Sequence, residues 1–233
     1  HSYNITHLLY NNVGSHGSGK TALFDARFAR LSECAQGLGL PFIKVSSNID
    51  SVLGMAFRST HTPRNVSVAH ILNKGATKYL YASAIPYQEV RIRDIGDGGD
   101  ALTYFDCITL GLLSKDSLEC ISSGGQYTRF KKTEIISDYE PSHLFLDVCV
   151  NPYYYEGNCS ECWKCRRTLL TLDILGKLEL YKDVFDLDKY YKIRDWYMGE
   201  VLSADDILCH EIVVAANERG YKFSSKQILK SNI

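Results

Sequence analysis

Four cysteines that lie close together in the sequence set the strongest limit on how this chain can fold. Cys149, Cys159, Cys162 and Cys165 follow the spacing C-x9-C-x2-C-x2-C. Thiolates are soft ligands, and four of them in a tetrahedron at about 2.3 Å satisfy a structural zinc ion completely. Each C-x2-C step lets one tight turn aim two sulfurs at one point. The spacing therefore predicts a closed zinc knuckle over residues 149–165, which leaves no coordination position for a substrate.

Disulfide bonds are the main alternative for these thiols. Two C-x2-C steps that share Cys162 suit chelation better than pairing. The sequence shows no signal-peptide pattern. Its remaining cysteines lie singly among apolar residues, as buried free thiols usually do, at Cys34, Cys107, Cys120 and Cys209. We therefore expect zinc rather than disulfides, and a cytoplasmic location for the protein.

The composition is that of an ordinary globular chain. Of 233 residues, 45% are hydrophobic and 23% are charged, which provides ample material for a core. The formal net charge of −1 gives no global attraction to nucleic acid or to an anionic membrane. No apolar run approaches the roughly 20 residues that a membrane helix needs. We expect no membrane association, and the sequence gives no clear sign of nucleic-acid binding.

The first part of the chain alternates strand-like apolar runs with helical patterns. We expect strands at 6–10, 42–45 and 78–82, separated by helices at 21–36 and 65–74. Alternating strands and helices with short connections are typical of a parallel sheet with helices packed on its faces. This order predicts an α/β fold, a doubly wound parallel sheet with helices on both faces.

The later part is expected to contain fewer strands. The patterns predict helices at 102–113, 131–138 and 163–175, and strands at 118–122 and 143–149. The strand at 143–149 would deliver the first zinc thiolate. Residues 94–100 read as a solvated acidic glycine loop. Ser203 reads as a helix N-cap, followed by the first-turn acids Asp205 and Asp206. We expect one α/β domain over residues 1–176, with a helical C-terminal appendage over residues 177–233.

One short motif suggests phosphate binding. Residues Gly14–Thr21 read GSHGSGKT, which fits G-x4-G-K-[ST] between an expected strand and an expected helix. In a P-loop the backbone N–H groups would cradle phosphates, Lys20 would reach them, and Thr21 would hold magnesium. Such an enzyme also needs an acid at the end of another strand, for which Asp147 is the candidate. A plain glycine turn is the alternative, and both interpretations remain open.

Several separate segments resemble one protein family. Cys149 followed by CSECWKCRR resembles the zinc site of the 7-cyano-7-deazaguanine synthases of queuosine biosynthesis. Three further segments resemble their P-G-R-N, Y-P-D-C and L-T-K-A-E-I-V motifs in the same order, namely TPRN at 62–65, YFDC at 104–107 and FKKTEII at 130–136. Residues 158–176 also match the N-C-x2-C-x-K-C-x-R-T-L-L run of synthase-like proteins. The resemblance covers about residues 5–176.

The resemblance implies a fold and an activity. The family belongs to the N-type ATP pyrophosphatases, which have a doubly wound parallel sheet. These enzymes use ATP with Mg²⁺ and cleave it to AMP and pyrophosphate, activating a carboxylate as an acyl adenylate. Their S-G-G-x-D-S pyrophosphate loop is absent from this sequence, and Gly14–Thr21 would lie in a loop that varies within the family. We expect that the chain is the C-terminal portion of a longer protein, rather than that it has lost the activity.

The resemblance also suggests roles for individual residues. Arg64 and Asn65 would lie near the nucleotide, where a guanidinium and an amide suit phosphate and base recognition. Arg129 and Lys132 would stabilise negative charge on the phosphates during catalysis. Asp106 would contact the substrate. Taken without the resemblance, the same residues read as a surface salt bridge, a helix N-cap, a solvated basic patch and a loop acid.

Three functions from different classes follow. The first is ATP-dependent carboxylate activation leading to amide or nitrile formation, with a small-molecule or peptide carboxylate as substrate. The second is a non-catalytic, zinc-braced interaction module, whose helical tail would bind a partner protein or a second copy of the chain. The third is a P-loop NTPase that uses Gly14–Thr21.

Overall fold

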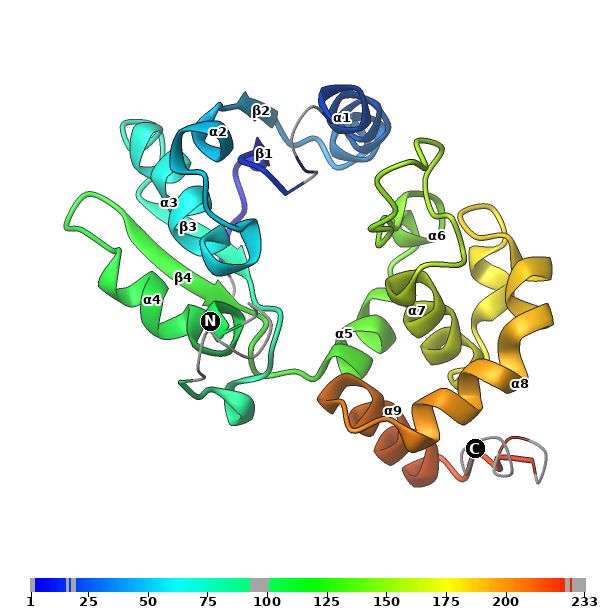
Figure 1. The fold of residues 1–233 in the computed structure, drawn as a ribbon. Coiled ribbons are helices and arrows are strands. Elements are labelled where there is room, and N and C mark those ends of the chain that lie inside the picture. The colour runs from blue at the N-terminus through cyan, green and yellow to red at the C-terminus, as the bar shows by residue number, and fades with distance from the viewer. Residues whose placement is uncertain (1–2, 16, 18–19, 93–100, 225–226, 228–233) are drawn as a thin grey trace. The chain divides into compact units, whose positions relative to one another are not determined.

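The computed structural model describes residues 3–15, 17, 20–92, 101–224 and 227 of the chain. These residues fall into two units, His1–Tyr127 and Thr128–Ile233, each with its own buried core. The chain has a mixed α/β composition, with strands in the first unit and helices in both (Figure 1). The expected boundary at residue 176 lies inside the second unit, together with the cysteines and the C-terminal helices.

The strands of the first unit form two parallel pairs. Strand β1 (Leu8–Asn12) pairs with β2 (Phe42–Ser46), and strand β3 (Lys78–Ala82) pairs with β4 (Glu119–Ser123). The described residues thus give two small parallel sheets, and they do not join these pairs into the single doubly wound sheet that the sequence predicts. The four strands expected in this region all occur, with bounds shifted by at most two residues.

Helices cover these sheets through aromatic and aliphatic contacts. Helix α1 (Thr21–Gly37) connects β1 to β2 and packs on them, with the Tyr10 and Phe24 rings stacked at 4.9 Å and those of Phe28 and Phe42 at 4.8 Å. A second core joins α3 (His61–Ile71) and α4 (Asp106–Leu112) to β4. Its buried members are Val66, Ala69, Leu110, Leu118 and Cys120.

Two of the expected helices in this unit have different bounds. Helix α3 begins at His61 rather than at residue 65, because Pro63 is tolerated in the first turn of a helix and does not end it. The expected helix at 102–113 divides into a 3-10 turn (Ala101–Phe105) and α4. A short helix, α2 (Ile49–Leu53), and two further 3-10 turns (Phe57–Ser59 and Tyr87–Glu89) complete the list of helical segments described here. The glycine loop expected at 94–100 lies outside the described residues.

The second unit is helical. Its main helices are α5 (Arg129–Ile136), α7 (Trp163–Ile174), α8 (Leu187–Ser203) and α9 (Ile207–Glu218), with α6 (Pro141–Phe145) and a 3-10 turn (Leu178–Tyr181) between them. Helix α8 packs against both α7 and α9 (Figure 1). Among the described residues, no helix is long and apolar enough to cross a membrane.

Two sequence predictions in this unit were wrong. The expected strand at 143–149 is a short helix followed by a segment without regular secondary structure. Pro141 favours the first turn of a helix, and the Ser142 hydroxyl donates to the carbonyl of Ile136 at 2.8 Å, which holds that turn against α5. Ser203 is the last residue of α8. The N-cap of α9 is Asp206, whose carboxylate accepts from two backbone N–H groups.

Candidate metal centre and polar pocket

The four predicted zinc ligands converge in the second unit. The Sγ atoms of Cys149, Cys159, Cys162 and Cys165 all lie within 4.8 Å of one another. Two of the separations are 3.4 Å, from Cys162 to Cys165, and 3.9 Å, from Cys162 to Cys149. A tetrahedron of sulfurs at about 2.3 Å from zinc has edges of about 3.8 Å. The cluster therefore has the size and ligand chemistry of a four-cysteine metal site.

The same distances argue against disulfides in this arrangement. A disulfide requires sulfurs about 2.05 Å apart, and all eight cysteines of the chain are free. Backbone N–H groups also point at the sulfurs, from Asn151 to Cys149 at 3.4 Å and from Cys162 to Cys159 at 3.3 Å. Such N–H groups commonly orient the sulfurs of metal sites.

Two buried polar residues fix the turn that carries the thiolates. The side chain of Asn158 accepts from Val148 N at 2.9 Å and donates to Leu146 O at 2.7 Å, which ties the knuckle to the segment before Cys149. Ser160 has a left-handed backbone with φ of 64°, and its hydroxyl accepts from Asp186 N at 2.8 Å at the start of α8. The metal centre and the C-terminal helices are therefore parts of one structure.

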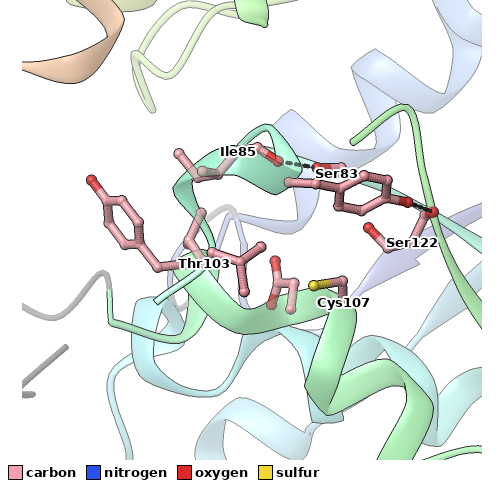
Figure 2. Close-up of a pocket in the computed structure, with 9 residues that line it drawn as sticks. Ser83, Ile85, Thr103, Cys107 and Ser122 are labelled. Carbon is pink, nitrogen blue, oxygen red and sulfur yellow. Dashed lines mark hydrogen bonds between the residues drawn. The ribbon is translucent and has the colours of Figure 1, made fainter. Parts of the chain in front are cut away.

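A separate polar pocket lies in the first unit. It opens where β3 and β4 end, with Ser83 immediately after β3 and Ser122 near the end of β4. Figure 2 shows these two residues with Thr103 and Cys107, which come from the turn before α4 and from α4 itself. Ligands of parallel α/β sheets characteristically bind at the carboxyl ends of the strands. The pocket therefore lies at the end of the strands where such ligands bind.

Asp106 is the charged residue of this pocket. It is only 4% exposed, and its Oδ1 accepts a hydrogen bond from the hydroxyl of Thr62. Its Oδ2 has no hydrogen-bond partner among the described residues. Burial raises the pKa of Asp106 to about 6, and the Thr62 hydrogen bond opposes this shift. The pocket is thus lined by a buried carboxyl group, one oxygen of which has no hydrogen-bond partner among the described residues.

A hydrogen-bonded group surrounds Asp106. The Tyr81 hydroxyl lies 3.0 Å from Nδ1 of His61, and Nε2 of the same ring lies 3.2 Å from the Thr103 hydroxyl. Burial raises the pKa of Tyr81, and the nearby charge of Asp106 raises it further. The resemblance places His61 in the same region, but a lone histidine is more often a hydrogen-bonded structural residue, so it was not among the predicted site residues. Tyr81 belongs to the strand expected at 78–82, and no motif assigned it a further role.

Arg64 and Asn65 lie at the start of α3, beside β1. The Arg64 side chain is fully buried, and its guanidinium donates to Val13 O at 2.9 Å and to Met55 O at 2.7 Å. It also forms an ion pair with Asp50. The side-chain carbonyl of Asn65 accepts a hydrogen bond from the side-chain amide of Asn11 in β1 at 3.1 Å. Both residues therefore hold α3 against the segments at the end of β1, and their roles with a nucleotide stay predictions.

Arg129 and Lys132 come together on α5 in the second unit. Burial lowers the pKa of Arg129. Burial, and then the nearby charge of Arg129, lower the pKa of Lys132 to about 8. Glu211 of α9 lies beside them and accepts from the backbone N–H of Arg129 at 3.0 Å. Sequence analysis missed Glu211, because no motif marks it and it lies 82 residues beyond Arg129.

The GSHGSGKT segment is described in part. Residues 16, 18 and 19 lie outside the described residues. Gly14 has a φ of 106°, Gly17 N donates to Gly14 O at 3.1 Å, and Lys20 immediately precedes α1. The predicted strand–loop–helix context is therefore present. The proposed P-loop acid, Asp147, lies in the second unit in a segment that is not a strand.

Comparison with known proteins gives no match to this chain, whether with family models, with curated proteins or with solved structures.

Proposed function

We propose that this chain belongs to an enzyme that activates a carboxylate by ATP-dependent adenylation, resembling the 7-cyano-7-deazaguanine synthases, on the way to an amide or a nitrile. The observation that carries the proposal is the buried, half-satisfied carboxyl of Asp106 in a pocket at the ends of parallel strands. Asp106 belongs to the YFDC segment that carries part of the resemblance.

Asp106 is suited to hold a substrate rather than to react with it. Its Oδ1 is fixed by Thr62, so only Oδ2 is available to accept an N–H or O–H donor from a ligand. Hydroxyls of Ser83, Thr103 and Ser122 provide further donors and acceptors around the same space. A polar, donor-bearing edge of a small molecule would suit this chemistry, in a space that measures about 10 Å³ without a ligand. The identity of the carboxylate that would be activated does not follow from the pocket.

The proposal includes a doubly wound sheet as its fold. Helix α3 supports this, because it hydrogen-bonds both parallel pairs: Asn65 contacts Asn11 of β1, and His61 contacts Tyr81 of β3. A helix that packs on two parallel pairs at once is consistent with both pairs belonging to one layer. By the resemblance, Arg64 and Asn65 of the first unit would have a role with the nucleotide. Arg129 and Lys132 of the second unit would have a role with the phosphates of ATP–Mg²⁺.

Zinc would be held by the four cysteines and would stabilise the fold of the second unit. A site with four protein thiolates is coordinatively complete, so the ion supplies structure and takes no part in the proposed reaction. Arg166 and Arg167 follow Cys165 directly and would offset the net −2 charge of a zinc ion with four thiolates. The cytoplasm, where thiols stay reduced, is the proposed location.

The test is ATP–pyrophosphate exchange, measured on the native gene product with a panel of small carboxylates. Exchange that requires one carboxylate would support adenylation. Asp106→Asn should raise KM for that carboxylate strongly, because the pocket loses an anionic acceptor, while the exposed Asp116→Asn should leave it unchanged. Absence of exchange with every carboxylate, in protein that binds ATP, would count against the proposal.

Two other functions are each supported by one observation. The strand–loop–helix context of Gly14–Thr21 supports a P-loop NTPase. That function would be favoured if Lys20→Ala abolished ATP binding while Arg129→Ala and Lys132→Ala did not. Exposed aromatic side chains on the second unit support an interaction module that binds a partner protein, among them Tyr153 at 78%, Trp163 at 54% and Tyr191 at 49%.

A further inference from the structure

The carboxyl of Asp106 leaves one oxygen unsatisfied at the pocket of the first unit. Asp106 is 4% exposed and lines this pocket, and its Oδ2 has no hydrogen-bond partner among the described residues. A buried carboxyl oxygen without a donor is destabilised, because it has lost its contact with water and gained no hydrogen bond in return. A ligand group that brings an N–H or O–H donor to this oxygen would remove that penalty.

The hydrogen bonds of His61 fix the proton of a second pocket residue, Thr103. The Thr62 hydroxyl donates its single proton to Asp106, so towards Nδ1 of His61, 3.1 Å away, it can only accept. Nδ1 therefore carries a proton, which the Tyr81 hydroxyl at 3.0 Å also accepts. A neutral imidazole has one such proton, so Nε2 of His61 accepts from the Thr103 hydroxyl at 3.2 Å. Thr103 then has only lone pairs to offer to a ligand.

Two further hydroxyls of the pocket donate their protons to main-chain carbonyls. The hydroxyl of Ser83 donates to the carbonyl of Ile85, as Figure 2 shows. The hydroxyl of Tyr87 donates to the carbonyl of Ser122 at 2.8 Å. Each hydroxyl has a single proton, so towards a ligand these two oxygens are acceptors. Together with the Asp106 carboxyl, they favour a ligand group that donates hydrogen bonds over one that accepts them.

The charge and the aromatic walls of the pocket favour a cation among the possible donors. Burial raises the pKa of Asp106 to about 6, so its carboxyl is mostly ionised at pH 7.5. Tyr87 and Tyr104 also line the pocket, and aromatic rings attract cations. Arg91 lies over the Tyr104 ring, with Cζ 4.5 Å from the ring centroid, but its charge is balanced by an ion pair with Glu89. A positively charged N–H donor therefore suits the pocket better than a neutral one.

The volume of the pocket sets the size of the group that enters it. The space measures about 10 Å³ without a ligand, which is room for roughly one water molecule. A primary ammonium group is close to that size and carries three N–H donors. A carboxylate or a phosphoryl group is larger and would bring acceptors to a lining that already consists largely of acceptors.

We propose that this pocket binds the primary ammonium group of a small molecule, with Oδ2 of Asp106 as the anionic acceptor and the hydroxyl oxygen of Thr103 as a second acceptor. The inference deepens the proposed function by naming a group that the substrate would carry. It rests on the proposed function only for the view that the amine-bearing molecule is the substrate. Binding of an amine follows from the hydrogen bonds, charge and volume of the pocket.

Protection of a thiol in the same pocket tests the proposal. Cys107 lines the pocket and is half-buried, and Cys34 is a half-buried thiol of the same unit that does not line it. The native protein is treated with ethyl methanethiosulfonate at pH 7.5, and mass spectrometry follows labelling at both cysteines. Methylammonium chloride should slow labelling of Cys107 with a half-maximal effect at roughly 10–100 mM, because so small a ligand binds weakly. Tetramethylammonium chloride has the same charge but no N–H donor and should not protect, and labelling of Cys34 should not change with either salt.

Two variants test the acceptors directly. Asp106→Asn should weaken protection at least about tenfold, because it removes the charged acceptor, and Thr103→Val should weaken it about fivefold. The matched controls are Asp116→Asn and Thr77→Val, which change exposed residues of the same unit and should leave protection as in wild type. If one of the pocket variants does not fold, the other decides. Saturation-transfer NMR on the methyl group of methylammonium repeats each comparison without a thiol reaction, so slow labelling of Cys107 does not prevent the test.

Three outcomes would overturn the inference. They are equal protection by tetramethylammonium, unchanged protection in Asp106→Asn, and no methylammonium binding to folded wild-type protein by either method, which would leave the pocket as a site for water. Protection with the expected pattern, in protein that shows no ATP–pyrophosphate exchange, would sustain this site and count against the proposed function. Exchange without methylammonium binding would sustain the proposed function and overturn this inference.

Discussion

The hydroxyl of Thr62 donates a hydrogen bond to Oδ1 of Asp106, and so joins the first turn of α3 to the first residue of α4. Thr62 is fully buried and Asp106 is 4% exposed, so the pair lies away from water. The hydrogen bond satisfies one carboxyl oxygen only. Asp106 therefore remains a group whose ionisation is disfavoured by its surroundings.

Asp106 should make the stability of the protein depend on pH. In the unfolded chain its carboxyl has a pKa near 3.8, and in the folded chain its pKa is about 6. Between these values the unfolded state binds fewer protons, so the free energy of unfolding falls as pH rises, until the folded carboxyl has also ionised above about pH 6. Asp106→Asn removes this loss. From pH 5 to pH 7.5 the variant should gain about 1–2 kcal/mol relative to wild type.

Urea unfolding at the two pH values measures this difference. The free energies of unfolding of Asp106→Asn and wild type are compared at each pH. The effects of all other titrating groups, including the cysteines of the cluster, then cancel in the difference. Asp116→Asn, an exposed acid in the same unit, should show no such change with pH. A constant difference between Asp106→Asn and wild type across this range would show that the carboxyl is not perturbed.

Arg64 should be important for the stability of the first unit. Its guanidinium is fully buried, forms an ion pair with Asp50 at 2.6 Å, and donates to two backbone carbonyls. Removing one partner of a buried ion pair leaves the other partner and the carbonyls unsatisfied. We expect Arg64→Ala to lower the free energy of unfolding by about 3–5 kcal/mol.

Denaturant unfolding of Arg64→Ala and of Lys78→Ala provides the comparison. Lys78 forms an exposed ion pair with Glu119, and its removal should leave the midpoint of unfolding unchanged. If Arg64→Ala instead unfolds like wild type but binds ATP more weakly, Arg64 is a nucleotide ligand, as the family resemblance suggests, rather than a structural residue.

Local sequence patterns predicted the secondary structure of the first unit well. The alternation of apolar strands and amphipathic helices depends on nearby residues, which the sequence shows directly. The grouping of the strands does not depend on nearby residues alone. The pairing of β1 with β2 and of β3 with β4 depends on contacts between distant segments. The doubly wound sheet therefore stays a prediction, while the parallel pairs are observed.

The cysteine cluster was predictable because its four members lie within 17 consecutive residues with a chelating spacing. The strand expected before it was wrong, because an apolar run such as HLFLD does not distinguish a strand from a short helix. The surroundings of the pocket were not predictable. His61, Tyr81 and Thr103 interact only because α3, β3 and the turn before α4 fold together.

The cysteine cluster should be required for folding of the second unit. Cys149, Cys159 and Cys165 belong to the main hydrophobic core of this unit, so loss of the metal would leave buried thiols without their ligand. Structural zinc binding is folding free energy. We expect Cys162→Ser to lose the bound zinc and to lower the free energy of unfolding by several kcal/mol.

Elemental analysis and a thermal melt on the same sample test this expectation. Cys34→Ser, which changes a half-buried thiol of the first unit, is the control and should retain one zinc per chain. A Cys162→Ser variant that keeps one equivalent of zinc and an unchanged Tm would refute the assignment of the four thiols as a structural zinc site.

Lys132 should react with amine-directed labels faster than the other lysine beside it. Burial and the nearby charge of Arg129 lower the pKa of Lys132 to about 8, and Glu211 partly opposes the shift. At pH 8 about half of its side chains would carry the reactive neutral amine. Lys131 is exposed and ion-paired with Glu134 at 2.6 Å. Mass spectrometry of the labelled protein compares the two adjacent sites.

Two variants identify the cause of this reactivity, because they should change the pKa of Lys132 in opposite directions. Arg129→Gln removes a repelling cation, so the pKa of Lys132 should rise and labelling at pH 8 should slow. Glu211→Gln removes the attracting carboxylate, so the pKa should fall further and labelling should quicken. Equal labelling rates for Lys132 in wild type and both variants would mean that these charges do not act on it.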